Sequence, residues 1–148
     1  MKLLTALVTA ATLLSACGRA PEGASTEGQP EVATGFLELP LESSAEDGTP
    51  VRLVGAALQL ETPTDTVPVV APSDEGVFSQ ALPLDLERVV LTGPWHLESM
   101  EAGEWRPLTA TLGSTPVWEA PQLADGEVTE IGFRFETPLG SVSFGQPR

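Results

Sequence analysis

The sequence lacks tyrosine and asparagine, and it contains a single cysteine and a single histidine among its 148 residues. One cysteine cannot form a disulfide within the chain, so the fold must be held together by its apolar core. One histidine excludes a metal site built from several imidazoles. The absence of asparagine excludes N-glycosylation and Asn-Gly turns.

Positive charge is also scarce, because seven Lys and Arg residues stand against 21 Asp and Glu residues. The acidic residues are spread along the chain, which is typical of a solvated surface. A field of this sign repels phosphate backbones, so we expect no nucleic-acid partner. The apolar content of 41% is normal for a globular protein, and the length allows one ordinary domain with appendages.

The common catalytic signatures are absent. The chain has no Gly-x-Ser-x-Gly elbow, phosphate-binding loop, dinucleotide fingerprint or His-Glu-x-x-His motif. The strand phase directs His96 to solvent, and no serine is placed beside it. A carboxylate pair for glycoside hydrolysis needs a cleft that so small a domain rarely offers. We therefore expect no enzyme and no cofactor.

Acidic residues in expected turns are the remaining candidates for metal binding; they are Asp47, Asp74, Glu75, Asp125 and Glu127. Calcium prefers such oxygen ligands, but the chain has no Asp-x-Asp-x-Asp-Gly loop. Asp-Gly pairs are ordinary turn formers. The sequence therefore predicts turns and no metal site, with calcium as the alternative.

The N-terminus combines one positive charge, Lys2, with an apolar stretch over residues 3–16. A membrane-spanning helix needs roughly 20 residues, so this stretch has the length of a signal-peptide core instead. It ends in Leu14-Ser15-Ala16-Cys17, which resembles the lipobox of bacterial lipoproteins.

The lipobox resemblance implies that residues 1–16 are a lipoprotein signal peptide and that Cys17 becomes the first residue of the mature protein. The Cys17 thiol then receives a diacylglyceryl group, and two or three acyl chains make a firm membrane anchor. Gly18 follows Cys17, whereas Asp at that place is the usual signal for retention in the inner membrane. In a cell with two membranes we therefore expect the outer one. The alternative is an ordinary secretory signal followed by an incidental cysteine.

Residues 18–34 are mostly small residues, Pro, Gly and Glu, with Val32 as the one large aliphatic residue. Such a segment buries too little apolar surface to offset the entropy of ordering. We therefore predict that residues 17–34 comprise the lipidated cysteine and a flexible tether, which would span roughly 20–25 Å on average.

Residues 35–148 show an alternating apolar pattern that is repeatedly interrupted by Pro and Gly. Short strands separated by turns predict an all-β fold, a single antiparallel β-sandwich of about seven or eight strands. A change of phase at Gly55 indicates a β-bulge, Pro68 indicates an edge strand, and Gly93-Pro94 indicates a turn. The apolar segments that suggest these strands are 37–41, 51–60, 66–70, 82–86, 89–91, 95–98, 105–112, 117–120, 129–136 and 142–144.

Several of these segments carry a family resemblance, namely Leu91–Glu98, Leu108–Pro116, Phe133–Phe135 and Val142–Gly145. Together with the opening strand Gly35–Leu41, the Asp125-Gly126 turn and the lipobox, they are similar to uncharacterised bacterial lipoproteins that have a single β-sandwich domain and occur in GC-rich bacteria. The resemblance implies an immunoglobulin-like sandwich in the cell envelope and carries no activity. A looser likeness to prealbumin-like domains rests on the strand pattern alone.

The three tryptophans are the rings best suited to stacking on sugars in a chain without tyrosine. Trp95 shares the phase of Leu97, so we expect it in the core. Trp105 lies opposite in phase to Leu108 and is the best candidate for exposure, whereas the pattern leaves Trp118 undecided. Trp105 and Trp118 are therefore the candidate ligand-binding residues, although an outer tryptophan often just covers a sheet edge.

Two functional hypotheses follow from these observations. The first is a non-catalytic, monomeric lipoprotein of the cell envelope with a structural or interaction role, attached to the membrane through Cys17. The second is a module that binds glycan or peptidoglycan through Trp105 and Trp118. The expected partners are the membrane and either cell-wall glycan or another envelope protein.

Replacing Cys17 by Ala should abolish lipid labelling and block cleavage before residue 17, because the thiol is the nucleophile that takes up the lipid. Mass spectrometry of the mature N-terminus measures both effects. An unmodified Cys17 thiol in protein extracted from membranes would contradict the prediction.

Overall fold

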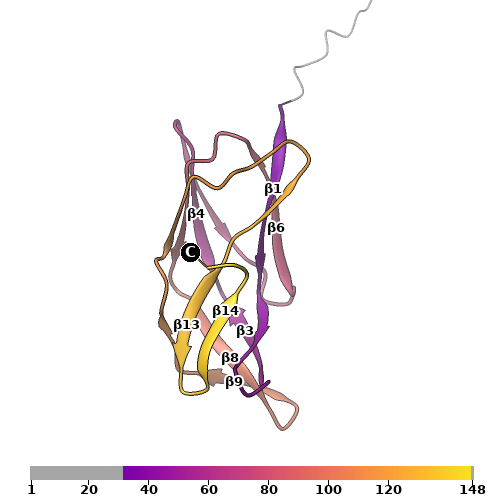
Figure 1. The fold of residues 1–148 in the computed structure, drawn as a ribbon, viewed down its shortest axis with the longest axis vertical. Helices are drawn as coiled ribbons and strands as arrows, with labels where there is room; N and C mark the ends of the chain where they lie inside the picture. Colours follow the sequence, from indigo (N-terminus) through magenta and orange to yellow (C-terminus); the bar gives the residue numbers. More distant parts are fainter. Residues whose placement is uncertain (1–31, 148) are drawn as a thin grey trace, which may run out of the picture. The chain divides into compact units, whose positions relative to one another are not determined.

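The computed structural model describes residues 32–147, and the compact unit that they form begins at Val32. The expected signal peptide, Cys17 and the tether as far as residue 31 lie outside the described residues. The described part contains fourteen strands and no helix (Figure 1), so none of its segments is a helix that could cross a membrane. The expected all-β class is confirmed.

The strands form two three-stranded and two four-stranded sheets, with the orders β12-β1-β6, β10-β13-β14, β11-β7-β4-β5 and β2-β3-β8-β9. All pairs within them are antiparallel except β1 with β12. The strand bounds are β1 (Thr34–Pro40), β2 (Glu42–Ser44), β3 (Pro50–Val54), β4 (Ala57–Glu61), β5 (Thr66–Val70), β6 (Val77–Pro83), β7 (Arg88–Thr92), β8 (His96–Glu101), β9 (Glu104–Leu108), β10 (Thr111–Leu112), β11 (Val117–Glu119), β12 (Val128–Glu130), β13 (Phe133–Thr137) and β14 (Gly140–Phe144).

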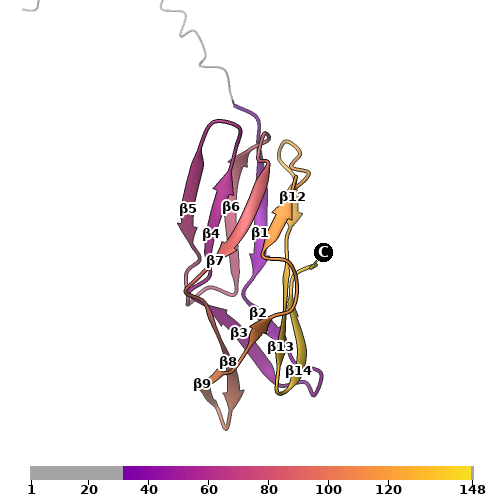
Figure 2. The same cartoon turned by 90° about the vertical axis from the view of Figure 1, so that its left-hand side faces the viewer.

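One apolar interior lies between these sheets. At one end the sheet that holds β1, β6 and β12 lies against the sheet that holds β4, β5 and β7, and at the other end β3 and β8 lie near β13 and β14 (Figure 2). The alternate residues that face inward form one continuous core. Its largest fully buried side chains include Phe133, Phe135, Phe144 and Leu97. The arrangement is a β-sandwich in the broad sense.

The strand count exceeds the expected seven or eight because several long apolar runs are each divided between two sheets. The single strand expected over residues 105–112 was wrong, because this segment forms β9, which pairs with β8, and β10, which pairs with β13. Residues 129–136, expected as one strand, form the end of β12, which pairs with β1, and most of β13, which pairs with β10 and β14. Ile131 between them is fully buried. The apolar alternation continues from β12 into β13 because both sheets face the same interior, so alternate side chains point inward in both strands.

The ladder formed by β3 and β4 with β7 and β8 corrects two local expectations. Val54 pairs with His96 and Ala57 pairs with Thr92, so the three residues 93–95 lie opposite the two residues 55–56. The extra residue therefore belongs to the partner strand, and the expected β-bulge at Gly55 was wrong. The expected turn at Gly93-Pro94, which has a cis peptide bond, does not reverse the chain. On either side of it, β7 pairs with β4 and β8 pairs with β3, and β3 and β4 are consecutive strands.

Two strand boundaries differ from expectation, and the expected edge position of Pro68 is confirmed. The expected strand over residues 82–86 is wrong, because β6 ends at Pro83 and Leu84 is 37% exposed. The first strand already begins at Thr34, one residue before the expected start of the domain. Pro68 lies in β5, which pairs only with β4, so the expected edge position is confirmed; an edge tolerates a residue without a backbone N–H.

Replacing Phe133 by Ala should lower the free energy of unfolding by about 3–5 kcal/mol, because the side chain is fully buried and leaves a cavity. The matched control is Phe36→Ala, which removes the same atoms from a side chain that is 39% exposed and should cost about 1 kcal/mol or less. Denaturant melts measure both values. Equal losses would show that the inner and outer faces are assigned wrongly.

Candidate functional site

Trp118 is a core residue, and its assignment as a ligand-binding residue was wrong. The side chain lies on β11, is 5% exposed, and its indole N–H donates a hydrogen bond of 2.8 Å to the carbonyl oxygen of Gly132. A ring held in this way has no face open to a sugar. The sequence phase was ambiguous because β11 is short and lies between prolines.

Trp105 lies on the outer face of its sheet, as the strand phase predicted. It pairs with Met100 across the β8–β9 ladder, whereas Leu108, Ala110 and Leu112 pack against the core. The ring is half-buried because the guanidinium carbon of Arg52 lies 4.5 Å from the ring centroid. This cation–π contact covers one face of the indole and fixes its orientation.

Arg52 also joins an ionic network on the same outer face. Its Nε donates a hydrogen bond of 2.7 Å to Oε2 of Glu98, which holds the pKa of the Glu98 carboxyl below its ordinary value. The exposed His96 places its Nε2 3.4 Å from Oε1 of the same residue. His96 therefore faces solvent, as predicted.

Nothing in this network supplies a nucleophile. The nearby hydroxyl of Ser99 is buried on the opposite face of the strand and makes no hydrogen bond. A nucleophile and its base must lie within hydrogen-bond reach of each other, and the strand separates Ser99 from His96. The network therefore orients Trp105 and has no evident chemistry of its own.

Trp95 packs against the core from the segment between β7 and β8. The ring makes an edge contact with Phe135, with the centroids 4.8 Å apart, and Phe135 in turn contacts Phe144. The expected core position of Trp95 is confirmed only in part, because the side chain packs against the core but is only partly buried.

Three of the acidic residues expected in turns, Asp47, Asp74 and Asp125, lie in turns, and Glu75 and Glu127 directly follow two of these turns. Oδ1 of Asp47 accepts a hydrogen bond of 2.9 Å from the backbone N–H of Thr49, which lowers the pKa of Asp47. Oδ1 of Asp125 accepts one of 3.1 Å from the N–H of Thr34. Within residues 32–147, no group of three or more Asp, Glu, His and Cys residues is placed to hold a metal ion.

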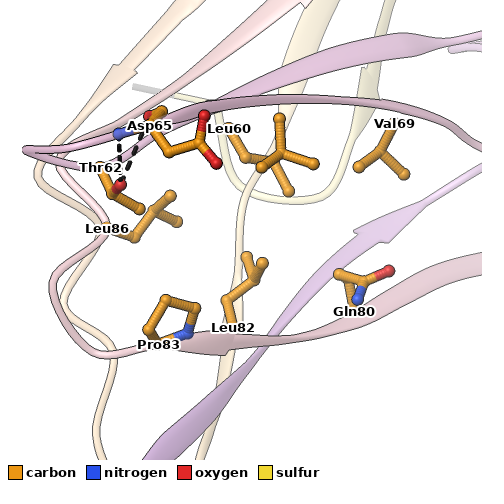
Figure 3. Close-up of a pocket in the computed structure, with 9 residues that line it drawn as sticks. Leu60, Thr62, Asp65, Val69, Gln80, Leu82, Pro83 and Leu86 are labelled. Carbon is orange, nitrogen blue, oxygen red and sulfur yellow. Dashed lines mark hydrogen bonds between the residues drawn. The ribbon is translucent and has the colours of Figure 1, made fainter.

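A cavity of about 370 Å³ opens between the β4–β5 hairpin and β6 (Figure 3). Sequence reasoning missed it. Most of its lining is apolar, and Figure 3 shows Leu60 and Val69 across from Leu82 and Pro83. The full lining is Leu60, Thr62, Asp65, Val67, Val69, Gln80, Leu82, Pro83 and Leu86.

The cavity exists because the sandwich is open on this side. β5 is the last strand of one sheet and β6 the last strand of the sheet that lies against it. Val67 pairs with the buried Leu60 and belongs to the inner face, yet it is 44% exposed. On β6, Gln80 takes an inner-face position opposite the buried Leu37. The open side therefore exposes part of the interior.

Asp65 places a carboxylate at the cavity, and the hairpin turn fixes its position. The N–H of Asp65 donates a hydrogen bond of 3.1 Å to Oγ1 of Thr62, and the N–H of Thr62 returns one of 2.9 Å to the carbonyl oxygen of Asp65. The N–H of Thr66 donates a bond of 2.8 Å to Oδ1 of Asp65. The carboxylate lies on the side of the turn that faces Leu60 (Figure 3).

Comparison of the chain with protein-family models, curated proteins and solved structures finds no match in any of the three. The resemblance to envelope lipoproteins and the choice between an immunoglobulin-like and a prealbumin-like sandwich therefore stay predictions.

Variants that retain a single tryptophan, with the other two replaced by Phe, should differ in fluorescence quenching by acrylamide. Trp105 should be quenched most and Trp118 least, with Trp95 between them, because Trp118 is buried and Trp105 lies on an outer face. Circular dichroism of each variant provides the control for folding. Quenching of Trp118 as efficient as that of Trp105 would contradict the assignment.

Proposed function

We propose that this chain is a non-catalytic, lipid-anchored protein of the cell envelope and that its β-domain is an interaction module. The lipobox at Leu14–Cys17 supports the anchor. The observation that carries the interaction role is the apolar cavity between β5 and β6. Small-ligand sites are typically concave, mostly apolar and of a few hundred Å³, with a small number of fixed polar groups.

The cost of keeping the cavity open supports a role for it. Burying apolar surface stabilises a fold by about 25 cal/mol per Å², and this chain has no possible internal disulfide to compensate for a smaller core. An inner-face residue such as Val67 would be covered if the two edge strands closed on each other. The open side therefore lowers the stability of the fold, a cost that is common at binding sites.

The polar groups at the cavity favour binding over catalysis. They are the carboxylate of Asp65, the amide of Gln80 and the hydroxyl of Thr62, which is already engaged in the turn. Acid–base or nucleophilic catalysis calls for a second group that exchanges a proton with the first. A lone carboxylate beside an apolar wall orients a ligand instead.

Glycan binding through Trp105 is the second candidate. The observation that favours it is the fixed, half-buried indole on the outer face, held by Arg52. Stacking would use the ring face that Arg52 does not cover. The buried Trp118 offers no second platform, so this candidate rests on one ring.

The mature chain from residue 17, with Cys17→Ser to leave it unlipidated, should bind the neutral dye N-phenyl-naphthylamine and enhance its fluorescence. Val67→Trp should weaken the binding about tenfold or more, because the added ring fills the cavity; tenfold corresponds to about 1.4 kcal/mol. The matched control is Val70→Trp on the same strand, where the side chain is 68% exposed and does not line the cavity.

Absence of dye binding, or equal weakening by Val67→Trp and Val70→Trp, would contradict the proposed binding role of the cavity. Titration of the same protein with soluble cell-wall glycans tests the second candidate, since stacking on Trp105 should shift the emission of a variant in which it is the one tryptophan left.

A further inference from the structure

Asp65 is the one ionisable group among the nine residues that line the cavity. Its Oδ1 accepts the hydrogen bond from Thr66, whereas no hydrogen bond or ion pair within the described part of the chain engages Oδ2. The turn holds this carboxylate in place before any ligand arrives. A fixed carboxylate with an oxygen to spare is a good acceptor for a cationic donor, because charge-assisted hydrogen bonds are stronger than neutral ones.

Further acidic residues lie next to the lining residues in sequence. Asp85 and Glu87 flank the lining residue Leu86 in sequence, and Glu61 precedes the lining residue Thr62. The nearest cation in sequence, Arg88, is engaged by Glu61 at 3.1 Å and by Glu119 at 3.2 Å. The formal net charge of the whole chain, −14, adds a long-range attraction for cations.

The remainder of the lining is suited to an apolar group. Leu60, Val69 and Leu82 project into the same space in Figure 3, and a cavity of about 370 Å³ is at the small end of ligand sites. An anionic amphiphile would meet like charge at Asp65. A neutral one would fill the apolar part and leave the charge of the carboxylate without a partner.

We propose that the cavity binds a small amphiphile with an apolar body and a cationic head group, such as an alkylammonium, with the ammonium group against Asp65. The proposal rests on the binding role of the cavity proposed above and adds the chemical class of the ligand. The apolar body contributes most of the binding free energy, and the carboxylate selects the sign of the head group.

A displacement series on the mature chain with Cys17→Ser tests the selection. Octylammonium, octanol and octanoate have the same alkyl chain and differ in head-group charge, and each is titrated against the bound dye. Octylammonium should displace the dye at a concentration about two- to fivefold lower than octanol, as for an ion pair with an exposed carboxylate. Octanoate should require a higher concentration than octanol. High salt should reduce the difference because it screens the charges.

Asp65→Asn removes the charge and keeps an Oδ1 that can accept the hydrogen bond from Thr66. This variant should bind octylammonium and octanol equally well. The matched control is Asp74→Asn, which changes the net charge by the same amount at an acidic residue that does not line the cavity. It should keep the preference for octylammonium.

The outcomes separate the two proposals. If the dye does not bind at all, the binding role of the cavity is overturned. If the dye binds but octylammonium displaces it no better than octanol, or if Asp65→Asn keeps the preference, the cationic ligand class alone is overturned. The comparison on the unsubstituted cavity decides the question even if Asp65→Asn does not fold.

Discussion

Several consecutive strands of this domain continue from one sheet into another, and the single interior depends on that continuity. β3 continues into β4 across Gly55 and Ala56, and β12 continues into β13 across Ile131 and Gly132. The crossing residues Ala56 and Ile131 are fully buried, so the core is continuous through each crossing. In a chain that can form no internal disulfide, this continuity lets four small sheets behave as one cooperative unit.

The open side of the sandwich follows from the same arrangement. β5 and β6 are edge strands of two different sheets, and the loop of residues 71–76 joins them. No strand crosses between the sheets there, so the two edges stand apart and the inner-face residues Val67 and Gln80 line a cavity. The feature that carries the proposed function therefore lies where this continuity between sheets stops.

The sequence was informative about which side chains face the interior and less informative about which strands lie together. The alternation around Leu37 and Phe133 placed both side chains in the core, because burial on one face leaves a local pattern. The same pattern could not show that the segment 93–95 has one residue more than the segment 55–56 opposite it, because that mismatch depends on which strands pair. The cavity was missed for this reason, since β5 and β6 are close in sequence but meet across two different sheets.

The charged groups near Trp105 and the carboxylate at the cavity differ in whether their hydrogen-bonding capacity is already used within the protein. At Trp105, Arg52 lies over the ring and also donates to Glu98, so both charges of that pair are already engaged. At the cavity, the backbone N–H of Thr66 holds the Asp65 carboxylate through Oδ1, and Asp65 lines unfilled apolar space. A network in which opposite charges pair with each other stabilises a surface. A fixed carboxylate that can still accept a hydrogen bond, next to an apolar cavity, is instead suited to selecting a ligand.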